Sequence, residues 1–455
     1  MAGIGFRLQA LVSKGSYLET ATAYVFSAII STGPWLSGVI ALVILSNTTS
    51  AYLTANDRSF LLATIISIFA MSLLVTGGPQ LLVTRYLADR LYSNERDSFA
   101  PTCTGVLFLM IPFSLLTAPF LLFAPFSIVY RLLTATLFLT LTMIWMVMAF
   151  LSAAREYFRL VLIFALCYGL GAGTSVVSGH LYGLVGSLAG FVLGQVICLA
   201  LLLISVYREF PSTQSCSFAY LSSIPKYWDL LVVGALYPVG IWADSIIFWL
   251  SPEGQNIQGF YHLFPPYDTA KFVIYLSTIP AAAIFMIALE TDFYRHYKNY
   301  YLLIQQKGTL SDLIQAKEGM IASVRSGIKL ILKVQGMIAL LLCLAARDLA
   351  AFVGIAPQWV PLLRIQTLAG TGQFLVFVLM LFLLYIDRRR ATLLAVGTFT
   401  ICNISLTLLS LYLGRAFYGL GYLGACIIGA GLGWILLMSR LKKLEYLTFM
   451  DQPLV

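Results

Sequence analysis

The sequence has 455 residues, of which 60% are hydrophobic and only 10% are charged. A soluble domain is about 25% charged and about half apolar, so this composition excludes an ordinary water-soluble protein and indicates that lipid surrounds much of the chain. The net charge of +9 could suggest a nucleic-acid partner, but the positions of the basic residues, given below, favour a different explanation.

The chain opens with a short amphipathic segment and shows no cleavable signal pattern. Arg7 and Lys14 are interspersed with Phe6, Leu8 and Leu11. A basic amphipathic stretch of this kind is typical of a helix that lies in the membrane interface. We therefore expect residues 1–14 to lie on the cytoplasmic surface ahead of the first span.

About twelve long apolar runs follow. Backbone polar groups in lipid must be hydrogen-bonded within their own segment, so each run is predicted to be a helix, and a span needs about 20 residues. The first six helices are predicted near residues 20–46, 60–82, 103–125, 132–153, 158–178 and 183–207. The second six are predicted near residues 227–250, 268–291, 328–346, 359–386, 391–413 and 418–439.

The basic residues orient these helices. If both termini are cytoplasmic, most of the 28 Lys and Arg residues fall in the inside segments. The outside segments hold only Arg58, Arg131, Arg347 and Arg415. Such an asymmetry is the positive-inside pattern of a multi-pass membrane protein. It explains the net charge without nucleic acid and supports cytoplasmic termini.

The polar stretch 208–226 divides the chain into two halves. Residues 1–207 and 227–455 each carry six spans, which predicts two parallel six-helix bundles joined by a cytoplasmic linker. Pro34 lies beside Gly33 in the first helix, and Pro238 lies near Gly240 in the seventh. We expect helix breaks at both prolines, in a pair that marks a transport pathway; the alternative is ordinary proline kinks.

The longest hydrophilic insertion lies near 295–325. Thr309 and Asp312 have the spacing of a helix N-cap, and apolar residues then recur with helical periodicity. The segment is predicted to be a cytoplasmic amphipathic helix. It either lies on the membrane or docks a cytosolic partner.

Motifs for catalysis and for metal binding are missing. The sequence has no GxxxxGK[ST] loop, no HExxH and no GxSxG elbow, its three histidines lie far apart, and its cysteines form no CxxC pair. We therefore expect no enzymatic activity, no cofactor and no metal site.

A few charges lie inside predicted spans, where a charge costs at least ~2.5 kcal/mol. Asp244 and Lys271 lie at similar depths below the same membrane surface, so a pair lining a water-filled cavity is predicted, with Asp268 as an alternative partner. Such a pair could contact substrate or couple transport to a cation. It could equally be a structural ion pair, or the side chains could extend to the interface.

Aromatic residues surround these charges. Tyr237 and Trp242 stand out on the seventh helix, because flat rings offer sugars an apolar surface. Trp and Tyr also concentrate at bilayer interfaces for reasons unrelated to ligand, so both explanations stay open. The further aromatic residues are Phe248, Trp249, Phe260, Tyr261, Phe264 and Tyr267.

Several patches, in order along nearly the whole chain, resemble the PelG family, the inner-membrane components of bacterial Pel exopolysaccharide systems. They include residues 1–6, 30–35, 84–92, 267–272, 275–280, 290–294 and 387–390. The resemblance implies the fold of the multidrug/oligosaccharidyl-lipid/polysaccharide exporter superfamily, and a location in the bacterial inner membrane. It also implies a polymer rich in N-acetylgalactosamine.

The same resemblance implies three partners: a cytosolic glycosyltransferase, a cyclic-di-GMP receptor membrane protein and a further inner-membrane subunit. The leading hypothesis is therefore export of a growing exopolysaccharide as part of a synthase complex. The alternatives are a lipid-linked oligosaccharide flippase, a cation-coupled drug antiporter of the same superfamily, or a membrane scaffold for the synthase. Deletion of roughly Lys307–Arg325 is expected to release the synthase if that segment docks it.

Overall fold

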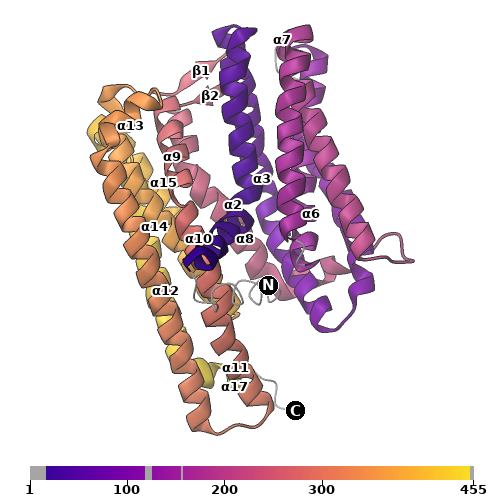
Figure 1. The fold of residues 1–455 in the computed structure, drawn as a ribbon, viewed down its shortest axis with the longest axis vertical. Coiled ribbons are helices and arrows are strands. Elements are labelled where there is room, and N and C mark those ends of the chain that lie inside the picture. The colour runs from indigo at the N-terminus through magenta and orange to yellow at the C-terminus, as the bar shows by residue number, and fades with distance from the viewer. Residues whose placement is uncertain (1–16, 118–125, 155–156, 451–455) are drawn as a thin grey trace. The chain divides into compact units, whose positions relative to one another are not determined.

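The computed structural model describes residues 17–117, 126–154 and 157–450, so the predicted interfacial segment 1–14 lies outside the described residues. The chain forms two compact units (Figure 1). Unit 1 comprises residues 1–31, 243–251 and 264–455, and unit 2 comprises residues 32–242 and 252–263. The division of the chain at the linker 208–226 stays a prediction.

The described residues of unit 2 form six helices, of which α2 and α8 also extend into unit 1. They are α2 (Tyr17–Thr48), α3 (Ala55–Tyr92), α4 (Phe99–Phe113), α6 (Ile128–Ala154), α7 (Tyr157–Glu209) and α8 (Ile224–Trp249). Thr54 caps α3 by accepting a hydrogen bond from the Asp57 backbone N–H at 3.2 Å, as a helix N-cap does. A short antiparallel hairpin, β1 (Gln255–Ile257) and β2 (Tyr261–Leu263), pairs Gln255 with Leu263 and was not predicted.

Helix α7 is two spans folded back on each other. Its 53 residues would reach about 80 Å if straight, far more than a membrane requires. Gly183 has φ 61° and interrupts the helical backbone, a conformation that costs glycine little. Hydroxyls of one arm donate to carbonyls of the other, including Ser175 to Ser187 at 2.6 Å. The described residues contain eleven helices long and apolar enough to cross a membrane. Counting α7 as two spans gives twelve, which confirms the prediction of about twelve.

The two predicted helix breaks are absent. Pro34 lies inside α2 and Pro238 inside α8, and each helix continues through its proline. A proline removes one backbone hydrogen bond, and that loss alone does not end a helix whose other bonds are intact. In α8 the freed carbonyl belongs to Gly234, and α3 packs so closely there that a Cβ at Gly77 would lie 2.3 Å from the Gly234 oxygen.

Unit 1 is built mainly from the C-terminal helices. They are α9 (Pro265–Ser277), α10 (Ile279–Ala288), α11 (Tyr294–Gln305), α12 (Leu310–Leu344), α13 (Ala346–Phe352), α14 (Val360–Tyr385), α15 (Arg389–Leu413), α16 (Leu420–Lys442) and α17 (Leu444–Met450). The eighth span, predicted as one helix, is divided at Thr278 into α9 and α10, and Pro280 lies in the first turn of α10, where a proline is well tolerated. A π-helical segment, Leu289–Phe293, then joins α10 to α11.

The predicted insertion forms a helical hairpin with its neighbour. The amphipathic segment and the ninth span are a single helix, α12, whose 35 residues begin at a capping box of Thr309 and Asp312. Helix α11 runs back against it, and Gly319 allows the close approach, since a Cβ there would lie 2.5 Å from His296 Nδ1. Lys317 forms an ion pair with Glu445 of α17. Figure 1 shows this hairpin with α17 beside it.

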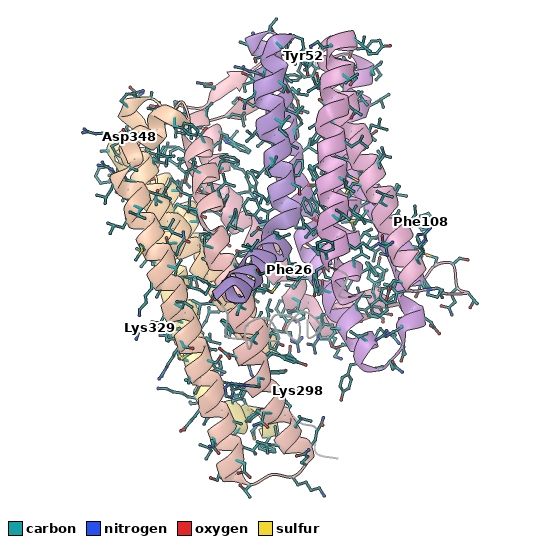
Figure 2. The ribbon with its side chains drawn as sticks, in the orientation of Figure 1. Phe26, Tyr52, Phe108, Lys298, Lys329 and Asp348 are labelled. Atoms are coloured by element: carbon teal, nitrogen blue, oxygen red, sulfur yellow. The ribbon has the colours of Figure 1, made fainter. Side chains whose placement is uncertain are left out.

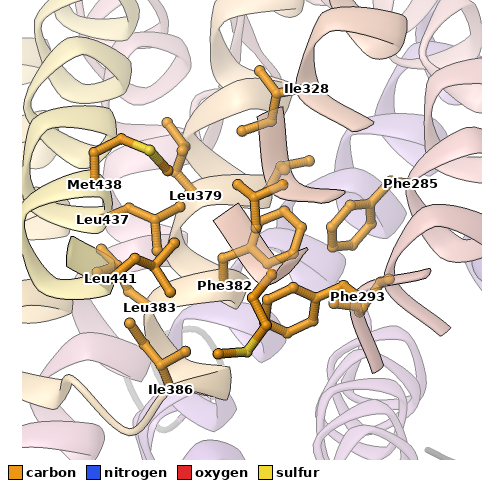
Figure 3. Close-up of a cluster of buried hydrophobic side chains, with 14 of the residues drawn as sticks. Phe285, Phe293, Ile328, Leu379, Phe382, Leu383, Ile386, Leu437, Met438 and Leu441 are labelled. Carbon is orange, nitrogen blue, oxygen red and sulfur yellow. The ribbon is translucent and has the colours of Figure 1, made fainter. Parts of the chain in front are cut away.

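Apolar residues from α10, α11, α12, α14, α15, α16 and α17 and from the π-helical segment form a core of unit 1 (Figure 3). Phe382 of α14 meets Phe285 of α10 at 5.7 Å and Phe293 at 5.0 Å between ring centres, both edge to face. Leu437 and Leu441 of α16 are fully buried in the same cluster. This core holds α10, α12, α14 and α16 together below the polar site described next.

Candidate functional site

A carboxylate with no exposed surface lies near the end of α8. Asp244 is 0% exposed, and Lys271 Nζ lies 2.8 Å from its Oδ1 and 2.9 Å from its Oδ2. The Tyr267 hydroxyl donates to Oδ2 at 2.6 Å, and Asn403 Nδ2 donates to Oδ1 at 3.3 Å. Burial of an unpaired charge is very costly, so these donors replace the water that Asp244 has lost.

Lys271 is equally enclosed, with 6% of its surface exposed. Besides the carboxylate, its ammonium donates to Ser245 Oγ at 3.1 Å. It also lies 4.8 Å from the centre of the Tyr422 ring, within range of a cation–π interaction. The cluster therefore carries no net charge, and each charged group has several partners.

Four helices of unit 1 bring these residues together. Tyr267 and Lys271 are four residues apart on α9 and so share a face. Asp244 and Ser245 are adjacent on α8, α15 contributes Asn403 and α16 contributes Tyr422. Thr407, one turn after Asn403, donates to Asn403 Oδ1 at 2.9 Å, which leaves the amide nitrogen directed to Asp244.

Asp268 does not pair with Lys271. Its carboxylate accepts from Trp249 Nε1 at 3.0 and 2.9 Å and from the Phe264 backbone N–H at 3.2 Å. It therefore ties the start of α9 to the end of α8. Asp268 was the predicted alternative partner of Lys271, and it binds Trp249 and the Phe264 backbone instead.

Aromatic rings enclose the ion pair on one side. Phe248 meets Tyr267 at 4.4 Å and Tyr418 at 4.9 Å between ring centres, and Phe264 meets Trp359 at 5.2 Å. All five rings are buried. In this structure they pack on one another and present no open surface to a ligand.

The other two predicted aromatic residues lie earlier on α8. Tyr237 and Trp242 are half-buried, belong to the part of α8 that clusters with unit 2, and make contacts of their own. Trp242 precedes Asp244 by two residues, which places it on a different side of the helix. Neither residue is a hydrogen-bond donor to Asp244. Their role in a substrate pathway stays a prediction.

Asp244 and Lys271 are both buried in this structure, and the water-filled cavity at the pair stays a prediction. The pairing itself forms as the depths of the two residues suggested. Side chains such as Tyr267, Asn403 and Tyr422 pack around the two charges and separate them from lipid. The role of the pair in transport stays a prediction.

Sequence reasoning missed the uncharged polar partners. Asn403 and Gln335 are fully buried within spans, and Gln335 Nε2 donates to Ser277 Oγ at 3.3 Å beside the interruption between α9 and α10. Gln335 Oε1 has no partner within the described part of the chain. The signal that identifies both is an amide side chain inside a long apolar run.

Solved structures with a similar fold are transporters. One is an outward-facing multidrug resistance MATE family transporter of the MOP superfamily, at 12% identity and a TM-score of 0.66, covering 96% of this chain and 98% of that one. A MOP superfamily transporter from Pyrococcus furiosus has 13% identity, a TM-score of 0.66 and the same coverage. The Vibrio cholerae MATE transporter VcmN has 14% identity and a TM-score of 0.62, covering 94% and 97%.

These similarities define the class of the fold, which is that of the MATE and MOP superfamily transporters, and the chain is a multi-pass membrane protein of that architecture. A comparison with curated proteins finds no match. The family model of PelG, "Putative exopolysaccharide Exporter (EPS-E)", matches residues 1–449. The chain therefore belongs to the PelG family, as the resemblance in the sequence indicated.

Proposed function

We propose that the chain moves an exopolysaccharide of the Pel type, rich in N-acetylgalactosamine, across the bacterial cytoplasmic membrane. The observation that carries this proposal is the family match over residues 1–449 on a transporter fold. The chain would have no catalytic activity of its own. Synthesis would take place on the cytoplasmic side, and the growing polymer would pass through the chain as it lengthens.

The ion pair supports export without a coupling cation. Both oxygens of Asp244 already face the ammonium of Lys271, so a sodium ion or proton could bind there only by displacing it. A cation-coupled antiporter needs a carboxylate to which the cation can bind and from which it can leave during the cycle, and here the Lys271 ammonium lies against both oxygens. We therefore propose that the pair positions α8, α9, α15 and α16 and that substrate movement does not depend on ion exchange at Asp244.

The α11–α12 hairpin is the proposed docking element for a cytosolic glycosyltransferase. It extends beyond the predicted span, and it leaves Leu302, Leu310 and Ile314 exposed, with Leu310 63% accessible. Exposed apolar side chains on an otherwise polar element are typical of protein contacts. A cyclic-di-GMP receptor membrane protein and a further inner-membrane subunit would complete the complex.

The proposal is tested in cells that lack this chain and keep the synthesis machinery. Hexosamine polymer is measured outside and inside the cells. Loss of external polymer with polymer trapped inside supports export, whereas trapped lipid-linked saccharide would make the chain a flippase. Unchanged external polymer contradicts the proposal, and loss of both pools indicates a scaffold that synthesis requires.

A further inference from the structure

An apolar groove with a cationic rim runs along the exposed face of α12. It has a volume of about 640 Å³ and lies between α12, α14 and α16, all within unit 1. Its floor is formed by apolar residues that include Leu332, Leu375, Leu379 and Gly431, with Trp434 at one side. Its rim carries Arg325, Lys329 and Lys333. Figure 2 labels Lys329 where it projects from the α12 ribbon.

The three cations form one stripe. They are spaced four residues apart and so lie on the same face of α12. All three are exposed, and none has a hydrogen bond or ion pair with any residue that the structure describes. Like charges at this spacing repel one another and destabilise a helix. The stripe therefore lacks a compensating anion within the described parts of unit 1.

The groove lies at the level of one leaflet. From Leu344, the outer end of α12, back to Arg325 is about 29 Å at 1.5 Å per residue, close to the thickness of the hydrocarbon core. Trp434 lies about 12 Å from the end of α16 at Lys442, and Leu379 lies about 9 Å from the end of α14 at Tyr385. Three helices thus place the groove in the leaflet next to these ends, which is cytoplasmic by the positive-inside rule.

The face around the groove is suited to lipid. Leu332, Met337 and Leu340 of α12 are exposed, as expected of side chains that meet acyl chains rather than water. A soluble anion could reach the cations but would leave the apolar floor uncovered. A helix from a protein partner would bury three unpaired cations against hydrocarbon, which is costly.

We propose that the groove binds one anionic phospholipid of the cytoplasmic leaflet. Its phosphate would lie beside Arg325 at the headgroup level. Lys329 and Lys333, about 6 and 12 Å further into the leaflet along α12, would extend their side chains toward it, and an acyl chain would follow the floor past Leu379 and Gly431. The long basic side chains can reach the headgroup level while their stems cover the apolar floor. This inference is independent of which polymer the chain transports.

The test is native mass spectrometry of the full chain reconstituted with phosphatidylglycerol and phosphatidylethanolamine in equal amounts. The unmodified chain is expected to retain phosphatidylglycerol preferentially. In R325Q/K329Q/K333Q, the ratio of lipid-bound to lipid-free chain should fall roughly tenfold or more, given what each basic residue contributes near an anionic surface. The charge-matched control R96Q/R208Q/K443Q removes three exposed cations elsewhere and should keep the retention.

A second pair of variants tests the floor. Gly431→Leu fills the groove, and a Cβ at that glycine meets no atom within 4 Å, so the helix accepts the change. The matched control is Gly336→Leu, an equally open glycine on α12 that does not line the groove. Retention of phosphatidylglycerol should fall in the first variant and persist in the second.

Three outcomes overturn the proposal. Equal retention of the two phospholipids removes the preference for an anionic lipid. Equal loss of retention in a groove variant and its control removes the assignment to this groove. Preferential retention of an added polyprenyl phosphate over phosphatidylglycerol would assign the groove to a lipid-linked intermediate instead.

Discussion

Asp244 and Lys271 form a buried ion pair, and the residues of this cluster come from four helices, α8, α9, α15 and α16. A buried ion pair gains from mutual attraction what each charge loses in hydration, so its net contribution to stability is small. Removing one partner is different, because the other charge stays buried without compensation. Replacing one charged residue of the pair should therefore destabilise the protein more than replacing both.

Asp244→Ala and Lys271→Met are each expected to destabilise unit 1 by about 3–5 kcal/mol, and the double variant by much less than the sum. The measurement is the temperature at which purified chain loses its monodisperse peak on size-exclusion chromatography, for the four members of the cycle. If the lowering of this temperature in the double variant equals the sum of the two single variants, the two charges do not stabilise each other, and the prediction fails.

The control is an exposed pair. Arg389 Nε lies 3.3 Å from Asp387 Oδ1 at the start of α15, and both side chains are partly exposed. Exposed pairs contribute about 0–1 kcal/mol. The Asp387→Asn and Arg389→Gln cycle should therefore give near-zero coupling under the same conditions.

The residues of this site differ in how far the sequence could predict them. Asp244 and Lys271 could be paired because charges inside apolar runs are rare and their depth follows from helix rise. Asn403 and Tyr422 could not, because one sequence does not show which helices meet. Asp268 is only three residues from Lys271 in the sequence. Its carboxylate nevertheless accepts hydrogen bonds from Trp249 and from the Phe264 backbone at the start of α9. Because these local hydrogen bonds hold Asp268, Lys271 pairs with Asp244.

At the scale of elements, the spans were predictable, and their interruptions were not. Apolar periodicity and length predict the position of most helices, whereas Pro34 and Pro238 do not end the helices that contain them. The interruption occurs instead at Thr278, where Pro280 follows within two residues. Close packing by glycine was also beyond prediction: a Cβ at Gly421 of α16 would lie 2.3 Å from the Leu406 oxygen of α15, a contact that depends on the neighbouring helix.

The α11–α12 hairpin leads to a prediction at this scale. Leu310→Glu with Ile314→Glu should release the cytosolic glycosyltransferase from membranes, because it puts charges on the exposed apolar residues while Thr309 and Asp312 still cap the helix. The measurement is the share of glycosyltransferase that sediments with membranes at equal levels of this chain.

The matched control is Tyr92→Glu with Phe218→Glu. These side chains are also exposed and apolar, and they lie on segments predicted to be cytoplasmic in unit 2. The control should leave the glycosyltransferase on the membrane. Equal sedimentation in both variants would remove the hairpin as the docking element.

At the scale of the whole molecule, the fold resembles MATE and MOP transporters although identity is only 12–14%. Fold similarity at this level follows from shared apolar spans and does not carry over a substrate or a coupling ion. The family match is what points to an exopolysaccharide as the substrate. A polymer longer than any enclosed cavity is moved more simply by extrusion during synthesis than by alternating exposure of a closed site.

The measurement that tests this account most directly uses inside-out membrane vesicles that contain the synthase complex. Nucleotide-activated N-acetylgalactosamine is added, and newly made polymer is challenged with an external glycosidase. With this chain present, the polymer should become resistant as it enters the lumen, and without the chain, any polymer that is made should stay sensitive. Equal resistance in both kinds of vesicle would contradict the account, because the polymer would then cross the membrane by another route.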